Sequence, residues 1–467
     1  MKYLLILCIV FFLSTASDGG KNKLENNDQK FITNVQITLE KGIEYFHSIN
    51  IYGGYVYDYT LDLNERWDDD GPSDEHTIEI QPPGTPTVGT SFLRAYKITK
   101  NQKYLVAAKD AARALIIGQN DLGGWNHQVH FNKSKDNIIS FDDNQTQSAI
   151  RFLMALDQVI EYDSLSVAVE KALNMMLTAQ FDNGGWPHRY PKEGNTNDFA
   201  TFNDGGINDC IKVMIDAHKY YGKEIYLKSI QNAGWFLFIS QQAPPQTGWA
   251  QQYNAYLQPA WARDFEPASL SPMVTLNNII TLIDLYLYTE KTKHLKLIPD
   301  ALQWIEETRL PNGKWPRFVE IGTNKPLYYD NGRIRVNSFE ELSLDRRTGY
   351  AYEIELESQL KVVIAKFKKV QNIGAKSFLE EKNRPLTNNE LVSELELIKP
   401  KILKIIKSQD AEGRWITKND RYRKEILRTK WNGEYIINDR VKSSTFNNNI
   451  NMLCYYLELQ NKIENRK

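Results

Sequence analysis

The chain has 467 residues, of which 42% are hydrophobic and 25% charged, with a formal net charge of −1 at pH 7. This composition is typical of a globular protein and excludes a long disordered chain. The near-neutral charge also argues against nucleic acid or a membrane surface as partners, although a local basic cleft for an acidic ligand remains compatible with it.

The N-terminus predicts export. Its sequence, MKYLLILCIVFFLSTAS, has a lysine near the start, an apolar run and then small residues, the layout of a secretory signal peptide at residues 1–17. No cysteine follows where a lipid could be attached, so we expect a secreted or periplasmic protein without an anchor. Residues 30–467 are expected to form one catalytic domain that acts as a monomer.

A sequence repeat indicates the architecture. Stretches resembling Gln-x-x-x-Gly-Gly-Trp recur at intervals of roughly 60 residues and then once after a longer gap. Their tryptophans are Trp125, Trp186, Trp249, Trp315 and Trp415. The glycines can adopt the positive φ angles that end a helix, and each tryptophan can pack back onto the helix ends. IYGGYVYDYT, with Tyr55 in place of tryptophan, resembles a degenerate first copy.

Pairs of amphipathic segments lie between these motifs. Residues 146–162 and 164–180 show apolar positions at i, i+3, i+4 and i+7, and similar patterns occupy 350–371 and 387–408. Repeated helical hairpins bury their inner faces by closing around an axis. We therefore predict an all-α fold, an α/α toroid or partial barrel of helical hairpins, with long irregular loops such as 319–348 framing a groove.

Two acidic sites precede helices at equivalent positions of neighbouring repeats. FDDNQT carries Asp142, Asp143 and Asn144, and TFNDGGIND carries Asp204. A single acidic residue before a helix is commonly a cap that binds free N–H groups. Two matched sites also fit a hard cation such as Ca²⁺, which prefers carboxylate and amide oxygens.

Cationic and aromatic residues gather in two later segments. WARDFEPASLSP holds Arg263 and Glu266, which could equally form a surface ion pair. The second segment combines tyrosines, among them Tyr350, with six cations: Arg317, Lys325, Arg333, Arg335, Arg346 and Arg347. Such a segment suits an anionic carbohydrate better than a neutral one, and nucleic acid is disfavoured because the rest of the chain is not basic.

Together, FDDNQT, GGWPHRYP, TFNDGGIND, WARDFEPASLS and GKWPRFVEIGTNKPLYYDNG followed by DRRTGYAY resemble pectate lyases of polysaccharide lyase family 10. The resemblance runs from about Val35 to Tyr352 and less distinctly to the C-terminus. It implies an α/α toroid that cleaves polygalacturonate by β-elimination, with Ca²⁺ bound to the uronate carboxylate and an arginine as the base.

Carried over to this chain, the resemblance assigns Asp142 and Asp204 as metal ligands, with Asp143 or Asn144 beside them. It makes Arg263 the first candidate for the base, and Lys325 the alternative, since a lysine pKa falls more readily in a cationic site. The remaining expected substrate-binding residues are Arg317, Arg346, Arg347 and Tyr350.

Two other functions remain open from the sequence. An inverting glycoside hydrolase could use Asp142 and Asp204 as acid and base. A uronate-binding protein could retain the groove without turnover. The histidines His127, His130 and His188 lack the spacing of a zinc site and are expected to line the groove or to be structural.

Overall fold

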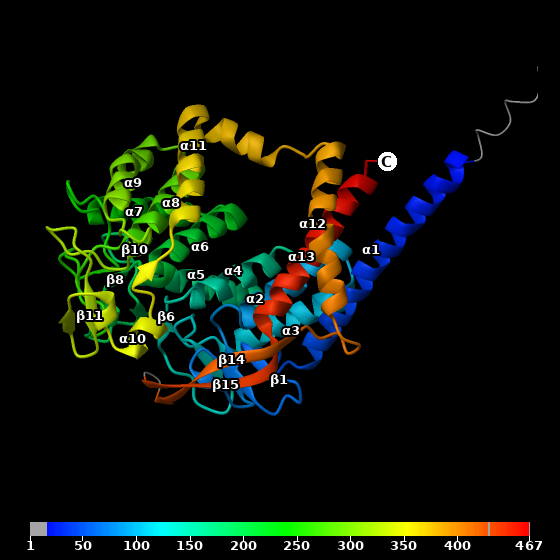
Figure 1. Ribbon diagram of the computed structural model, residues 1–467, viewed down its shortest axis with the longest axis horizontal. Helices are drawn as coiled ribbons and strands as arrows, with labels where there is room; N and C mark the ends of the chain where they lie inside the picture. Colours follow the sequence, from blue (N-terminus) through cyan, green and yellow to red (C-terminus); the bar gives the residue numbers. More distant parts are fainter. Residues whose placement is uncertain (1–15, 428–429, 467) are drawn as a thin grey trace, which may run out of the picture.

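The computed structural model describes residues 16–427 and 430–466 (Figure 1), so most of the predicted signal peptide, residues 1–15, lies outside the described residues. The α-helices are α1 (Ala16–Ser48), α2 (Thr85–Thr99), α3 (Gln102–Gly118), α4 (Gln145–Asp157), α5 (Asp163–Ala179), α6 (Gly206–Tyr221), α7 (Glu224–Ser240), α8 (Pro272–Thr289), α9 (Ile298–Glu307), α10 (Leu344–Gly349), α11 (Glu357–Asn383), α12 (Asn388–Ser408) and α13 (Ser443–Glu464). Short 3₁₀ helices are η1 (Thr196–Asp198), η2 (Asn203–Gly205), η3 (Thr292–Leu297) and η4 (Phe339–Glu341).

The strands are short, with two exceptions near the C-terminus. They are β1 (Asp58–Thr60), β2 (Arg66–Asp68), β3 (Gly71–Pro72), β4 (Thr77–Glu79), β5 (Gln128–His130), β6 (Ile139–Ser140), β7 (Arg189–Tyr190), β8 (Ala200–Thr201), β9 (Gln252–Tyr253), β10 (Trp315–Pro316), β11 (Tyr328–Asp330), β12 (Ile334–Val336), β13 (Glu353–Ile354), β14 (Ile416–Leu427) and β15 (Lys430–Lys442).

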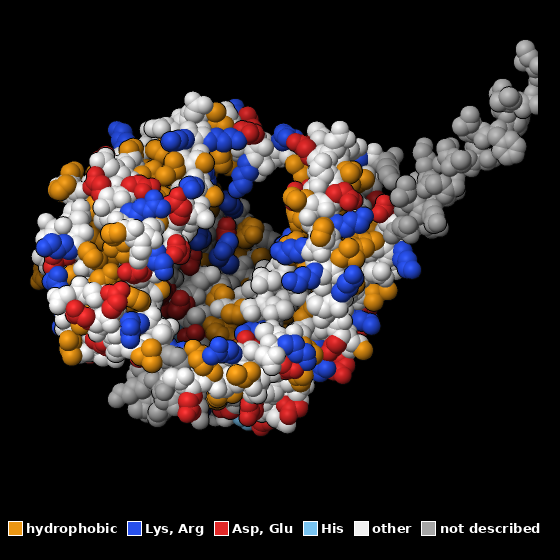
Figure 2. Space-filling model, viewed as in Figure 1, with side chains coloured by type: hydrophobic (Ala, Val, Ile, Leu, Met, Phe, Trp, Pro, Cys, Tyr) orange, Lys and Arg blue, Asp and Glu red, His pale blue; other side chains and the backbone are white. Residues whose placement is uncertain are grey.

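The helices form two layers around a common axis. The inner helices contact one another in the order α13, α2, α4, α6, α8 and α11, and α12 packs against α13 and α1. Each inner helix follows an outer helix and a tryptophan or tyrosine loop, as the repeat predicts. The predicted α/α toroid is therefore confirmed, and its arc is open between α11 and α12, where Figure 2 shows a hollow.

The repeated tryptophans close the ends of the outer helices. Each indole N–H donates to a carbonyl in the last turn of the preceding outer helix, where carbonyls lack an intrahelical donor. The pairs are Trp125 with Leu115, Trp186 with Met176, Trp249 with Leu237, Trp315 with Ile305 and Trp415 with Ile405, at 2.8 to 3.0 Å. The predicted packing of these side chains is confirmed.

Threonines fix the starts of the inner helices against the same loops. Thr146 Oγ1 accepts the Trp125 N–H at 3.2 Å and donates to the Trp125 carbonyl at 2.8 Å. Thr85 makes the same pair of bonds with Tyr55, at 2.9 and 3.1 Å. Tyr55 thus occupies the tryptophan position, as expected for a degenerate first copy.

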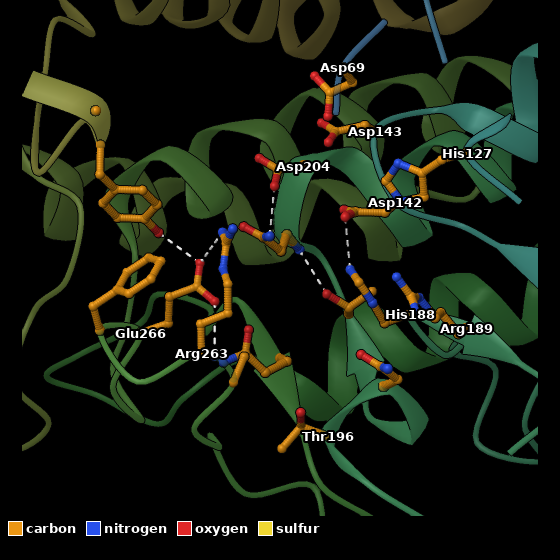
Figure 3. A pocket seen from close by; sticks show the side chains of 18 of the residues that line it. Asp69, His127, Asp142, Asp143, His188, Arg189, Thr196, Asp204, Arg263 and Glu266 are labelled. Atoms are coloured by element: carbon orange, nitrogen blue, oxygen red, sulfur yellow. Dashed lines mark hydrogen bonds and ion pairs between the residues drawn. The ribbon is translucent and has the colours of Figure 1, made fainter. Parts of the chain in front are cut away.

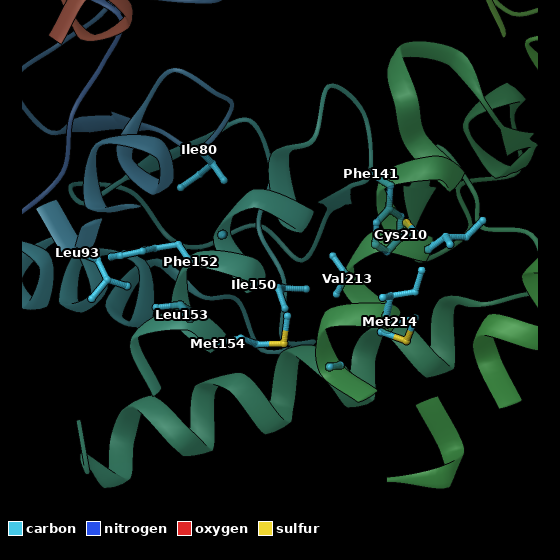
Figure 4. Close-up of a cluster of buried hydrophobic side chains, with 14 of the residues drawn as sticks. Ile80, Leu93, Phe141, Ile150, Phe152, Leu153, Met154, Cys210, Val213 and Met214 are labelled. Atoms are coloured by element: carbon cyan, nitrogen blue, oxygen red, sulfur yellow. The ribbon is translucent and has the colours of Figure 1, made fainter. Parts of the chain in front are cut away.

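The core lies between the two layers (Figure 4). Side chains of α2, α4 and α6 such as Leu93, Phe152 and Met214 are buried there. Cys210 and Cys454 are buried and form no disulfide. In the described part of the chain, no helix is long and apolar enough to span a bilayer.

A β-ribbon in the C-terminal part is the main element that the sequence did not predict. Strands β14 and β15 pair with each other and, through β15, with β1, giving a sheet of order β14-β15-β1-β2-β3. Helix α11 also begins at Glu357 instead of 350, because Glu353 and Ile354 pair with β10.

Candidate active site

Short two-stranded sheets between the loops of neighbouring repeats place the acidic residues on one rim of the toroid. Strand β6, in the loop after Trp125, pairs with β7, in the loop after Trp186, and β8 pairs with β9, in the loop after Trp249. Asp142 follows β6 before α4, and Asp204 follows β8 before α6. Because the two positions are equivalent in neighbouring repeats, both carboxylates lie at the same rim, as the repeat predicts.

These residues are not side-chain caps. Helices α4 and α6 have Asn144 and Gly205 as their N-cap residues, and neither has a side-chain cap hydrogen bond. Asp143, Asn144 and Asp204 have φ angles of 44°, 59° and 45°, a left-handed region that is uncommon outside glycine and best tolerated by Asn and Asp. The capping interpretation therefore does not explain the carboxylates.

Asp142, Asp143 and Asp204 converge into one cluster. One carboxylate oxygen from each lies within 4.8 Å of those of the other two. Asp142 Oδ1 and Asn144 Oδ1 are buried and have no hydrogen-bond partner among the described residues. Clustered oxygens with unmet bonding capacity are the donor set that a hard cation such as Ca²⁺ requires, so the residues fit this ion.

The pKa shifts of the three aspartates also indicate a cation site. Burial, followed by the charges of Asp142 and Asp204, raises the pKa of Asp143 to about 8. Burial and Asp142 also raise the pKa of Asp204. Burial acts upward on the pKa of Asp142 too, but His188, whose Nε2 lies 3.0 Å from Asp142 Oδ2, outweighs it and holds that pKa below its usual value. Without a cation, three anions cannot share this site at neutral pH.

Arg263 faces this cluster from the loop before α8. Its Nη2 donates to Glu266 Oε1 at 2.6 Å, and Glu266 is 2% exposed. The Tyr350 hydroxyl donates to the same oxygen at 2.8 Å. Burial acts to lower the pKa of Arg263, but Glu266 outweighs this effect and raises it above its ordinary value. Arg263 is thus held as a fixed cation beside the acidic cluster.

Two more predicted arginines lie nearby. Arg317 is buried, with its guanidinium 4.3 Å from the centre of the Tyr350 ring and 3.7 Å from Asp204 Oδ1. Arg346 is buried as well, with its guanidinium 4.1 Å from the Phe265 ring centre. Stacking on aromatic rings orients both charges and limits their motion.

These groups border one cavity of about 600 Å³ (Figure 3). Of the predicted residues, the structure brings Asp142, Asp143, Asp204, Arg263, Arg346 and Tyr350 into its lining. Arg317 and Asn144 are not part of the lining, although Arg317 contacts the lining residues Tyr350 and Asp204. Lys325 and Arg347 are exposed and outside it.

His127 and His188 line the cavity, which is one of the two roles expected for them, and His188 orients Asp142. The lining also includes residues that the sequence did not single out, and Asp69 lies beside Asp143 in Figure 3. Arg189 lines the cavity with a buried Nε that has no hydrogen-bond partner, and no described acidic side chain pairs with it. Arg423 comes from the unpredicted strand β14. The motif GGWPHRYP was the available signal for His188 and Arg189.

The fold and the site together define the class of this protein: an α/α toroid in which an acidic, cation-type cluster faces arginines across one cavity. The family described as pectic acid lyase matches residues 130–314. The resemblance to pectate lyases expected from the sequence is therefore confirmed for the central part of the chain, which carries Asp142, Asp204 and Arg263.

Solved structures of similar fold include two from one family. A mutant of a Family 10 polysaccharide lyase from Cellvibrio cellulosa in complex with trigalacturonic acid is 19% identical, covering 62% of this chain and 98% of its own, with a TM-score of 0.48. The non-mutant form gives 19% and 0.47. A D-mannose isomerase structure is 12% identical over 91% of this chain and 97% of its own, with a TM-score of 0.50, a likeness of fold alone. No curated protein matches the chain.

Proposed function

We propose that this protein is a Ca²⁺-dependent pectate lyase that cleaves polygalacturonate by β-elimination and releases unsaturated oligogalacturonides. The observation that carries the proposal is that the carboxylate cluster and Arg263 line the same cavity. The match of residues 130–314 to pectic acid lyases supports the substrate class.

The reaction needs a base at C5 of a uronate and a means to neutralise its carboxylate. In β-elimination the C5 proton moves to the base, the C5–H electron pair forms the C4–C5 double bond, and the C4–O bond breaks so that the leaving oxygen takes a proton. The C5 proton becomes more acidic when cations surround the adjacent carboxylate. Arg189 is a cavity cation that would do this from the protein side.

Asp142, Asp143 and Asp204 would hold the Ca²⁺ ion, with the unpartnered Oδ1 of Asp142 as a primary ligand. Bound there, the ion would neutralise the substrate carboxylate next to the reacting carbon. His188 keeps Asp142 ionised and oriented. A residue that fixes the orientation of a metal ligand in this way increases the affinity of the site for the metal.

Arg263 is our candidate for the residue that takes the C5 proton. The ion pair with Glu266 favours its protonated form, so removal of the proton requires additional positive charge nearby, which a bound Ca²⁺ ion would supply. Lys325 is the less favoured base because its exposed side chain lies outside the cavity lining. Arg317 and Tyr350 would orient Arg263 and the sugar, and Arg347 would contact only substrate that extends beyond the cavity.

The geometry disfavours the hydrolase alternative. Inverting hydrolases keep their two carboxyl groups roughly 6.5 to 9.5 Å apart to admit a water, whereas the oxygens of Asp142 and Asp204 come within 4.8 Å. The uronate-binding alternative differs from the lyase only in turnover.

Incubation of purified protein with polygalacturonate and Ca²⁺ tests the proposal. We expect ultraviolet-absorbing unsaturated uronates that EDTA abolishes, and a loss of turnover with retained binding in Arg263→Ala. Saturated reducing ends would identify a hydrolase instead, and tight binding without any product would identify a binding protein.

We also propose that the protein is exported as a monomer, secreted or periplasmic. This rests on the signal-like residues 1–17, so the N-terminal sequence of the mature protein recovered outside the cytoplasm is the test.

A further inference from the structure

The ribbon β14–β15 reaches the active-site cavity from the C-terminal part of the chain, outside the segment that matches pectic acid lyases. Figure 1 shows it running from β1 towards α10. Among the ribbon residues that the structure describes, Arg423 on β14 lines the cavity, and its side chain is 24% exposed. The ribbon is therefore part of the cavity wall.

The base of the ribbon is fixed on the face opposite Arg423. Tyr422 stacks near Trp67, with ring centres 6.2 Å apart, and its hydroxyl donates to Asp58. The buried guanidinium of Arg440 lies between the two rings, 3.8 Å from the centre of Trp67 and 3.3 Å from that of Tyr422. Because neighbouring residues of a strand point to opposite faces, this anchoring of Tyr422 directs Arg423 towards α10 and the cavity.

The contact with α10 is close and specific. Arg423 Nη2 donates to Asp345 Oδ1 at 3.1 Å and to Thr348 Oγ1 at 3.2 Å. A Cβ at Gly349 would lie 2.1 Å from Arg423 Nη1, so the guanidinium lies directly against the backbone of α10 at this glycine.

Two arginines of this wall share one carboxylate. Asp345 Oδ2 accepts from Arg346 at 2.6 Å, while its Oδ1 accepts from Arg423. Arg346, Asp345 and Arg423 all line the cavity. Besides Arg263, the cavity therefore has a second wall that carries arginines, and it is built by elements far apart in the sequence.

We propose that Arg423 contacts a substrate carboxylate and, with Arg346, forms an additional subsite that binds a uronate away from the bond that is cleaved. The proposal rests on the proposed lyase function for the identity of the anion. A polyuronide presents one carboxylate per sugar, so a wall that carries arginines at the edge of the cavity suits a further sugar of the same chain.

The test compares Arg423→Ala with Arg421→Ala. Arg421 lies on the same strand, is exposed, packs on the Tyr435 ring at 4.0 Å and does not line the cavity. KM and kcat are measured on polygalacturonate and on oligogalacturonides of increasing length. In Arg423→Ala, loss of one charge-assisted contact should raise KM on the long substrates about tenfold or more. KM on the shortest cleaved oligomer should not change, and kcat should stay within about twofold of the wild-type value. Arg421→Ala should resemble the wild type in both constants.

Equal KM values for Arg423→Ala, Arg421→Ala and the wild type would overturn the proposal. A fall in kcat on substrates of every length would overturn it too, because it would assign Arg423 a structural role through Asp345. Arg423→Lys, which keeps the charge but not the fork of donors, serves if the alanine variant does not fold: an intermediate KM supports the subsite, and a wild-type KM contradicts it.

A failure of the lyase function is separable from a failure of this inference. If the wild type makes no unsaturated product, the subsite is tested by calorimetric measurement of oligogalacturonide binding. Weaker binding by Arg423→Ala than by the wild type supports the subsite, and equal binding overturns it. If the wild type neither cleaves nor binds them, both proposals fall.

Discussion

The orientation of Asp142 depends on His188, which occupies Oδ2 and leaves Oδ1 without a protein partner. Replacement of His188 by alanine should weaken Ca²⁺ binding about 10- to 100-fold, as expected for a residue that holds a metal ligand. Calorimetric titration of the metal and the Ca²⁺ dependence of lyase activity measure this. His218, which contacts Tyr288 and does not line the cavity, provides the control variant; the same Ca²⁺ affinity in both variants would contradict the assignment.

Asp143 makes the metal-free protein sensitive to pH. Burial, then Asp142 and Asp204, raise its folded-state pKa from 3.8 to about 8. Between these values the unfolded chain has lost this proton and the folded protein retains it, so stability falls as pH rises from about 4 to about 8. In EDTA, the Tm of the wild type should fall across this window more steeply than that of Asp143→Asn.

Added Ca²⁺ should cancel that difference, because a bound cation favours the ionised form of Asp143. The gain in Tm on adding Ca²⁺ should therefore grow with pH in the wild type. Parallel Tm profiles of the two proteins in EDTA would show that Asp143 does not titrate in this window.

The sequence predicted the residues of the site that belong to the repeat and missed those that tertiary contacts deliver. Asp142 and Asp204 could be paired because each occupies the same place in its hairpin. Asp69 lies in a run of three acids that is typical of an exposed turn, and Arg423 reaches the cavity only because the ribbon is anchored on Trp67. Lys325 and Arg347 share a segment with Arg346, but neighbours along a loop need not point into one cavity.

At the scale of elements, the tryptophan loops hold each outer helix to its inner partner. Trp186→Phe removes the N–H that reaches the Met176 carbonyl in the last turn of α5 at 2.9 Å. A buried acceptor left without a donor costs about 1–3 kcal/mol, so urea denaturation should show a loss of that size. Trp235→Phe on α7, where the side chain is 51% exposed, should change stability by less than about 0.5 kcal/mol; equal effects would contradict the role of the loop.

The helices were predictable from their period because one face of each is buried along its whole length. Residues 164–180 correspond closely to α5, and 387–408 to α12. The ribbon β14–β15 gave no comparable signal, since its first strand is rich in charged residues and its pairing with β1 joins segments nearly 400 residues apart. Only the folded arrangement brings these strands together.

At the scale of the whole molecule, α12 and α1 join the last repeat to the first. Gln409 Nε2 donates to the Thr38 carbonyl at 2.9 Å, and Gly413, with φ 91°, lies against α1 so that a Cβ there would be 2.5 Å from the Lys41 carbonyl oxygen. Gly413→Ala should therefore lower the free energy of unfolding by about 1–3 kcal/mol more than Gly222→Ala. Gly222 also has a positive φ but open space around it, so the comparison isolates the contact between the repeats; equal losses in chemical denaturation would show that the junction is not tightly packed.

The most direct measurement is a crystal structure of Arg263→Ala with Ca²⁺ and an oligogalacturonide. The account predicts an ion bound by Asp142 and Asp204, a uronate carboxylate beside it, and the C5 hydrogen directed towards the space left by the missing guanidinium. An ion or a sugar chain bound elsewhere on the protein, with the acidic cluster and this cavity empty, would contradict it.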